Sequence, residues 1–221
     1  MSDDLKRQAA IAALAEIRDG MIVGLGSGST ASIFIRELGK ARRDVEGIPT
    51  SEESRRIAAE VGLRLTTLNE HPEIDVTVDG ADEVSPELYL IKGLGGALVR
   101  EKIVAHASRR VIIIVDESKL VERLGTRSVI PVEVIPLAVP RVLLQLKDAR
   151  VREKNGQPFI TDNGNLILDW QHGAIDDAPA LEKRLKSMTG VVDSGIFTGV
   201  ASVVVVAGST GIRTMTPTLK R

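Results

Sequence analysis

The feature that most constrains the fold is residues 111–115, a run of five β-branched side chains that contains no polar group. Such a run is typical of a strand buried on both faces, as in a parallel sheet that helices cover on each side. Strand-like runs also occupy residues 21–23 and 74–78, and apolar residues at helical spacing mark segments 3–18 and 96–108. Strands that alternate with helices in this way predict an α/β fold with an open parallel sheet.

The order of the elements changes near residue 127. From there we expect a strand at 129–135, a helix at 139–149, strands at 151–159 and 166–170, a helix at 178–188 and a strand at 191–197. The two middle strands flank an Asn163-Gly164 pair, which favours a tight turn, and the β-α-β-β-α-β order is ferredoxin-like. We therefore predict a Rossmann-like α/β domain over residues 1–126 and 199–221, interrupted by a smaller ferredoxin-like α+β domain over residues 127–198.

Composition excludes several classes of protein. The chain has twenty-nine basic and thirty acidic residues, so a basic surface that binds the phosphates of nucleic acid is not expected. Only about 2% of the side chains are aromatic, so a platform for base stacking is not expected either. The absence of cysteine excludes disulfides and thiolate chemistry. Residues 194–212 carry no charge, but nine of these nineteen residues are Gly, Ser or Thr, which is too polar for a membrane span. With an acidic N-terminus that does not resemble a signal peptide, we expect a cytoplasmic protein.

Ligands of open parallel sheets bind beyond the carboxyl ends of the strands, and four loops there contain unusual residues. The first, residues 24–30, joins a strand to a helix and is rich in Gly, Ser and Thr. Its N–H groups, hydroxyls and helix dipole favour an anion. It is not a P-loop, and Ser29 occupies the third glycine position of a dinucleotide fingerprint. A phosphate monoester therefore suits it best, the alternative being a simple tight turn.

The second loop places Asp79, Asp82 and Glu83 within five residues after a strand. Three carboxylates can bind a metal, bind sugar hydroxyls or transfer protons, although the lack of a nearby histidine disfavours a transition metal. A solvated turn is the alternative.

The third loop, residues 92–96, leads into a helix in which Glu101 has only apolar neighbours at helical spacing. A carboxylate in an apolar stripe needs a partner or has a raised pKa. A raised pKa suits a general base, and a structural salt bridge is the alternative.

The fourth loop, residues 116–119, directly follows the run at 111–115. Lys119 is placed to contact an anion, and a surface turn is the alternative reading of this loop.

Taken in order, these four loops resemble those of the type A ribose-5-phosphate isomerases. The resemblance rests on GLGSGST at 24–30, DGADEV at 79–84, KGLGGAL at 92–98 with REK at 100–102, and DESKLV at 116–121. It continues through LG at 124–125, PVEV at 131–134, TDNGN at 161–165 and GVVDSGIF at 190–197, so it covers nearly the whole chain.

The resemblance implies an aldose–ketose isomerase of the pentose phosphate pathway, which interconverts ribose 5-phosphate and ribulose 5-phosphate without a metal or organic cofactor. It assigns proton transfer to Glu101, with Asp79, Asp82 and Lys92 as further catalytic groups. The implied substrate-binding residues are Ser27, Gly28, Ser29, Thr30, Asp79, Gly80, Ala81, Asp82, Lys92, Gly93, Leu94, Gly95 and Lys119. The family's usual assembly is a homodimer or a dimer of dimers, and a homodimer is expected here.

One position departs from the family pattern. Leu94 stands where the family often has glycine, so leucine would be strained if this position required a positive φ.

Two other functions compete with that of an isomerase. A nicotinamide-dependent dehydrogenase would also use a glycine-rich loop after the first strand, but Ser29 disfavours it. A non-catalytic sugar-phosphate sensor would share the fold, but no DNA-binding module or basic face accompanies it.

Overall fold

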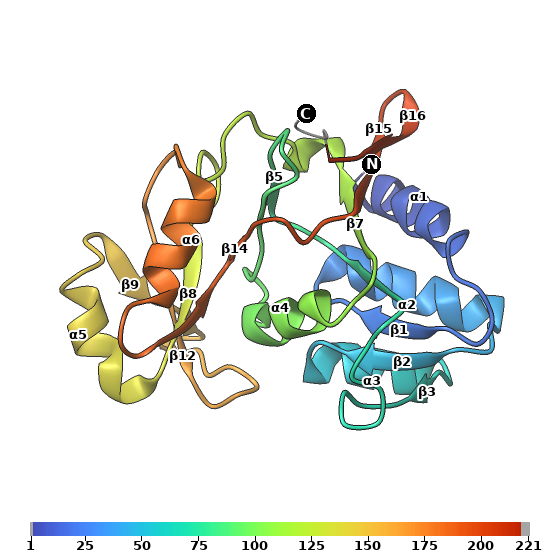
Figure 1. Cartoon of the computed structure of the whole chain (residues 1–221), viewed down its shortest axis with the longest axis horizontal. Coiled ribbons are helices and arrows are strands. Elements are labelled where there is room, and N and C mark those ends of the chain that lie inside the picture. Colours follow the sequence, from blue (N-terminus) through green and yellow to red (C-terminus); the bar gives the residue numbers. More distant parts are fainter. Residues whose placement is uncertain (1, 218–221) are drawn as a thin grey trace. The chain divides into compact units, whose positions relative to one another are not determined.

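A computed structural model describes residues 2–217, which form two compact units (Figure 1). Unit 1 comprises the chain up to Ala81, Arg100–Leu120 and the chain from Val200 onward. Unit 2 comprises Asp82–Val99 and Val121–Gly199. Among the described helices, none has the length and apolar character needed to cross a membrane.

Unit 1 is built on a seven-stranded sheet in the order β16-β15-β7-β4-β1-β2-β3. Its strands are β1 (Ile22–Leu25), β2 (Glu46–Pro49), β3 (Arg64–Leu65), β4 (Val76–Asp79), β7 (Val111–Asp116), β15 (Val203–Gly208) and β16 (Gly211–Met215). All neighbours pair in parallel except β15 and β16, which are antiparallel. The helices are α1 (Ser2–Leu14), α2 (Ser29–Ala41), α3 (Glu52–Glu60) and α4 (Leu98–His106), of which α4 enters unit 1 at Arg100.

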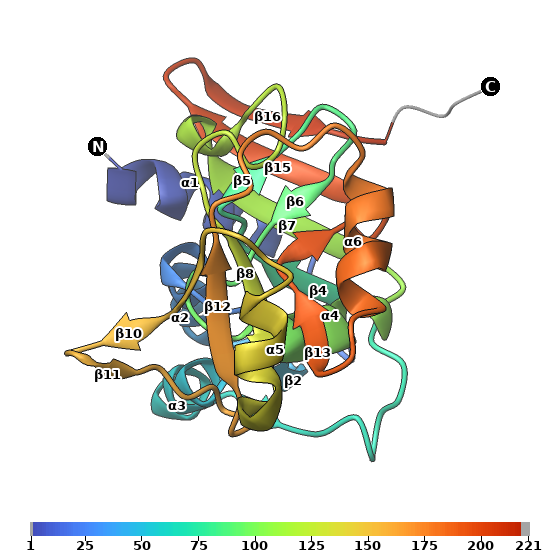
Figure 2. The same cartoon turned by 90° about the vertical axis from the view of Figure 1, so that its left-hand side faces the viewer.

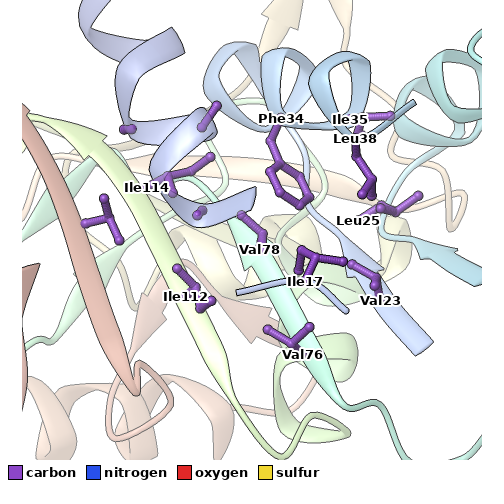
Figure 3. Close-up of a cluster of buried hydrophobic side chains, with 14 of the residues drawn as sticks. Ile17, Val23, Leu25, Phe34, Ile35, Leu38, Val76, Val78, Ile112 and Ile114 are labelled. Atoms are coloured by element: carbon purple, nitrogen blue, oxygen red, sulfur yellow. The ribbon is translucent and has the colours of Figure 1, made fainter. Parts of the chain in front are cut away.

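Helices cover both faces of this sheet, as the run at 111–115 predicts. On one face, Phe34 and Leu38 of α2 belong with Val78 of β4 and Ile112 of β7 to one apolar cluster, which also includes side chains of α1 and α3 (Figure 3). On the other face, Val104 of α4 packs in a separate buried cluster. Every residue of β7 is buried. The parallel sheet buried on both faces is therefore confirmed.

Unit 2 contains a four-stranded antiparallel sheet in the order β13-β8-β12-β9. Its elements are β8 (Ile130–Val134), α5 (Val139–Leu143), β9 (Ala149–Val151), β12 (Leu166–Trp170), α6 (Ala178–Lys186) and β13 (Val191–Ser194) (Figure 2). Val142 of α5 and Leu185 of α6 are fully buried in the apolar cluster on this sheet. This chain order and strand order are those of the ferredoxin-like fold, so the predicted fold class is confirmed.

A second, three-stranded sheet in unit 2 accounts for its boundaries. It has the order β14-β6-β5, formed by β14 (Ile196–Phe197), β6 (Leu90–Ile91) and β5 (Glu83–Val84). The Glu83 carboxylate also accepts hydrogen bonds from the backbone N–H groups of Gly125, Arg127 and Ser128, at 2.6, 2.7 and 2.5 Å. These pairings place residues 82–99 and 121–126 in unit 2, whereas the sequence boundary at 126/127 groups them with the Rossmann-like domain.

Three expected elements differ from the structure. The helix expected at 139–149 ends at Leu143. The strand expected at 151–159 is interrupted by a small hairpin of β10 (Glu153–Lys154) and β11 (Gln157–Pro158). This hairpin turns at Asn155 and Gly156, whose φ angles of 55° and 74° suit the tight turn that such a pair favours. The strand expected at 191–197 breaks at Gly195, where a Cβ would collide with the Lys92 carbonyl.

We expect Glu83→Gln to destabilise the protein by about 2 kcal/mol, because the amide removes the charge and an acceptor from three backbone donors. Urea unfolding of the variant and of wild type measures the difference. Glu122→Gln is the matched control, since Glu122 is exposed. Equal stability of the Glu83 and Glu122 variants would contradict the anchoring role of Glu83.

Candidate active site

The first group of predicted site residues lies where the strand order of the seven-stranded sheet reverses. From β1 the sheet continues to β2 and β3 on one side, and from β4 to β7 and β15 on the other. The loops that follow β1 and β4 therefore flank the switch point, where ligands of such sheets bind. An added Cβ at Gly80, after β4, would lie 4.0 Å from Cβ of Thr30, so the two loops are in contact range.

The loop after β1 opens into the N-terminus of α2. Gly28 is the N-cap, with φ of 91°, a conformation that favours glycine. Ser29 is exposed at the first helical position, and the first turn holds no acidic residue. Exposed N–H groups and hydroxyls at the positive end of a 13-residue helix are suited to bind an anion.

The hydroxyl of Ser27 belongs to a small polar network in unit 1. It lies 2.8 Å from the hydroxyl oxygens of both Thr50 and Ser51, at the end of β2. Thr50 also donates to the Leu25 carbonyl at 3.0 Å, and Ser51 caps α3 by accepting from the Ser54 N–H at 3.0 Å. Thr50 and Ser51 are thus supports of the glycine-rich loop that the sequence motifs do not reveal, although hydroxyls at the end of a neighbouring strand are a visible signal.

Asp79 ends β4 and is 2% exposed. Its Oδ1 accepts hydrogen bonds from the N–H groups of Ser27 at 3.0 Å and Gly80 at 2.7 Å. A Cβ at Gly26 would overlap the Asp79 carboxylate. Glycine at position 26 is therefore what allows the loop after β1 to close onto this aspartate.

Glu101 lies in the first part of α4 and is 4% exposed. The Ile74 N–H, just before β4, donates to the Ala107 carbonyl at 2.9 Å. Val104, in contrast, lies over Gly24, which pairs with Thr77 further along the strands. The helix α4 therefore runs opposite to β1 and β4. Glu101 precedes Val104 by three residues on the same helix face, so it lies about one turn closer to the carboxyl ends of those strands.

A salt bridge holds the residue next to Glu101. Arg100 donates to Glu52, the first residue of α3, at 2.8 Å, and this hydrogen bond lowers the pKa of the Glu52 carboxyl. Ser51, the N-cap of α3, is also the residue that contacts Ser27. The start of α4 and the glycine-rich loop are therefore both tied to the start of α3.

Lys119 lies at the same edge of the sheet. It ends a short 3-10 helix, Glu117–Lys119, directly after β7, and Asp116 caps that helix by accepting from the Ser118 N–H at 2.9 Å. Because β7 is the neighbour of β4, Lys119 follows the strand next to Asp79. Lys119 is partly buried.

The second group of predicted site residues belongs to unit 2. The Asp82 carboxylate accepts from the Leu94 N–H at 3.1 Å, which joins it to the loop at 92–96. Lys92 is buried, with its ammonium 5.6 Å from the centre of the Phe197 ring. The positive φ angles of this loop are at Gly93, 96°, and Gly96, 89°, and Leu94 is not in that region. Leucine at position 94 is therefore unstrained.

Comparison with known proteins identifies the family. Residues 46–211 match the family model of ribose 5-phosphate isomerase A (phosphoriboisomerase A). The ribose-5-phosphate isomerase A of Rhodopseudomonas palustris (strain HaA2) is 53% identical over 227 residues, which cover 96% of this chain and 97% of the relative. The chain belongs to the ribose 5-phosphate isomerase A family.

Solved structures agree with this membership of the isomerase family. The ribose 5-phosphate isomerase A of Methanocaldococcus jannaschii is 43% identical, with a TM-score of 0.92 over 96% of this chain and 98% of that one. A D-ribose-5-phosphate isomerase in complex with phospho-erythronic acid is 39% identical, with a TM-score of 0.94 over 98% of this chain and 99% of that one. The resemblance drawn from the four loops is confirmed.

For this member of the isomerase family, the structure gathers the predicted residues in two sets. Unit 1 holds Ser27 to Thr30, Asp79 to Ala81, Glu101 and Lys119, and unit 2 holds Asp82 and Lys92 to Gly95. Glu83, the third carboxylate of the loop, accepts backbone N–H groups of residues 125–128. Within residues 2–217, no three His, Asp or Glu side chains are grouped so that they could hold a metal ion.

Proposed function

We propose that this chain interconverts D-ribose 5-phosphate and D-ribulose 5-phosphate, and that Glu101 is the base that moves the proton between C2 and C1. The observation that carries the proposal is the position of Glu101. It is a buried carboxylate on α4, about one turn nearer than Val104 to the strand ends at which Asp79 and the loop at 27–30 lie. Membership of the isomerase family supports the reaction.

The chemistry needs one base that reaches two neighbouring carbons. With the sugar in its open-chain form, the base takes the proton from C2, and the C2–H electrons form a C1=C2 double bond as negative charge moves to O1. The resulting enediolate takes the proton back at C1, while the O2 proton passes to O1 and the C2 carbonyl forms. A positioned carboxylate can perform both carbon proton transfers, provided that the developing oxyanion is stabilised.

Other residues have roles that follow from their chemistry. Asp79 and Asp82 accept hydrogen bonds from sugar hydroxyls and assist proton transfer between oxygens. Lys92 is the cation that stabilises the enediolate oxygen. The backbone contacts of the two aspartates support these roles, because Ser27 and Leu94 hold the carboxylates in fixed orientations.

The phosphate of the substrate is assigned to the start of α2. Ser27, Gly28, Ser29 and Thr30 offer N–H groups and hydroxyls there, and Lys119 adds a positive charge from the loop after β7. The relative solved with phospho-erythronic acid supports a substrate that carries both a phosphate and an enediolate-forming end. That ligand joins a phosphate to a planar carboxylate, and a planar carboxylate resembles the O–C–C–O edge of an enediolate in shape and charge.

We further propose that the enzyme works as a cofactor-free homodimer in the cytoplasm, as the resemblance implies. Three exposed apolar side chains close together in sequence support self-association. They are Ile135 and Leu137, before α5, and Leu144, directly after it. Leu137 is 92% exposed, an unusual degree for a leucine in a folded unit.

Glu101→Gln is expected to lower kcat by about 10² to 10⁴-fold, because the amide keeps the shape of the side chain but cannot accept the proton. Binding of phospho-erythronic acid, measured by calorimetry, should stay within a few-fold of wild type. Glu153→Gln, at an exposed position, is the control and should be fully active. More than a tenth of wild-type kcat in Glu101→Gln would rule out this role.

Replacing Ser29 and Thr30 by alanine is expected to weaken the reaction of ribose 5-phosphate and to leave the poor reaction of ribose nearly unchanged. Each charge-assisted hydrogen bond to phosphate contributes about 1.5–3 kcal/mol to binding. Ribose has no phosphate and makes none of these bonds, so the replacements should not weaken its reaction. The measurement is kcat/KM for both sugars. Ser209→Ala with Thr210→Ala, an exposed pair in the β15–β16 turn, is the matched control. An equal proportional loss for both sugars would mean that the loop does not bind phosphate.

A further inference from the structure

A partly buried arginine of unit 2 binds the backbone of the lysine-containing loop. Arg152 follows β9, and its side chain is 11% exposed. Its Nη1 donates to the carbonyl oxygens of Gly93 at 2.9 Å and Leu94 at 2.8 Å. One guanidinium nitrogen thus fixes two successive peptide groups of the loop at 92–96.

The guanidinium is itself held in place. Its Nε donates to Asp169 Oδ2 at 2.9 Å and its Nη2 donates to Asp169 Oδ1, which makes a two-pronged ion pair with a residue of β12. The backbone of Arg152 is fixed as well, since its N–H donates to the Ile167 carbonyl and its own carbonyl accepts from the Phe159 N–H, each at 2.8 Å. A lysine could supply the charge here but not this paired geometry.

Fixing these carbonyls also fixes the N–H groups on the other side of each peptide. In a planar trans peptide the C=O and the following N–H point in opposite directions. When the Gly93 carbonyl faces Arg152, the Leu94 N–H faces away from it, and this is the N–H that Asp82 accepts. When the Leu94 carbonyl faces Arg152, the Gly95 N–H is likewise directed away from the arginine.

The same hairpin region supports the end of the loop. The Phe159 ring occupies the space that a Cβ at Gly96 would need. Arg152 and Phe159 flank the β10–β11 hairpin, so both supports come from a part of unit 2 distant in sequence from the loop.

We propose that Arg152 is a positioning residue for the isomerase reaction. Held by Asp169, it sets the peptide planes at 93–95, and so orients the Asp82 carboxylate and the Gly95 N–H toward the substrate. The inference rests on the proposed function of the loop as part of the substrate site. If Arg152 is a positioning residue, replacing it should lower kcat even though the protein still folds.

The test compares Arg152→Met with wild type and with Arg141→Met, an exposed arginine of α5 in the same unit. A displacement of about 1 Å at reacting groups costs on the order of 10²-fold in rate. We therefore expect kcat of Arg152→Met to fall about 10- to 100-fold, with a KM change of less than about threefold, because the phosphate is bound by other residues. Inhibition by inorganic phosphate should be unchanged, and phospho-erythronic acid should bind more weakly.

Two further variants keep the test decisive if Arg152→Met does not fold. Arg152→Lys should recover part of the lost kcat, and Asp169→Asn should lower kcat in the same direction by a smaller factor. Wild-type kcat in all three variants would overturn the proposal. A loss of phosphate inhibition that parallels the loss of turnover would also overturn it, because a general structural defect produces that pattern. Full activity of Glu101→Gln would instead overturn the proposed function.

Discussion

The hydrogen bonds that Asp79 accepts from the N–H groups of Ser27 and Gly80 are the interaction on which the rest of unit 1's site depends. They require the strand order to reverse between β1 and β4, and they require glycine at position 26. With the loop after β1 closed onto Asp79, the start of α2 is presented at the sheet edge. Glu101 lies toward the same edge because α4 runs opposite to the strands.

Unit 2 contains the same kind of hydrogen bond, from a loop N–H to an aspartate. Asp82 accepts the Leu94 N–H, as Asp79 accepts that of Ser27, so each aspartate of one short loop holds a glycine-rich loop through a backbone donor. Glu83 extends the pattern by accepting three backbone N–H groups of residues 125–128. All three carboxylates of this loop therefore accept backbone N–H groups from other loops.

The sequence predicts what local pattern determines. The buried run at 111–115 predicts β7 and the two-sided parallel sheet, and the glycine-rich loop at 24–30 predicts an anion site at a helix start. The positions of the predicted site residues in unit 1 follow from the rule that ligand-binding loops gather at the carboxyl ends of parallel strands. In unit 2 the strands are antiparallel, so this rule does not place Asp82 and the loop at 92–96.

Other features depend on contacts between residues distant in sequence. The assignment of residues 82–99 to unit 2 depends on β6 pairing with β14, more than one hundred residues later. The support of the lysine loop by Arg152 depends on a side chain about sixty residues away. No local periodicity signals either contact. The turn at Asn155 and Gly156 is different, because an Asn-Gly pair is a local signal for a tight turn. The expected strand at 151–159 runs across this turn and overlooks that signal.

The most direct test of the central claim is the fate of the C2 hydrogen when ribose 5-phosphate is converted in D₂O. A carboxylate base that takes a proton and returns it to C1 exchanges with solvent, so ribulose 5-phosphate should carry deuterium at C1 by NMR. Glu101→Gln should lower turnover and deuterium incorporation together, by about 10² to 10⁴-fold. Deuterium incorporation at C1 by Glu101→Gln at the wild-type rate would contradict the account.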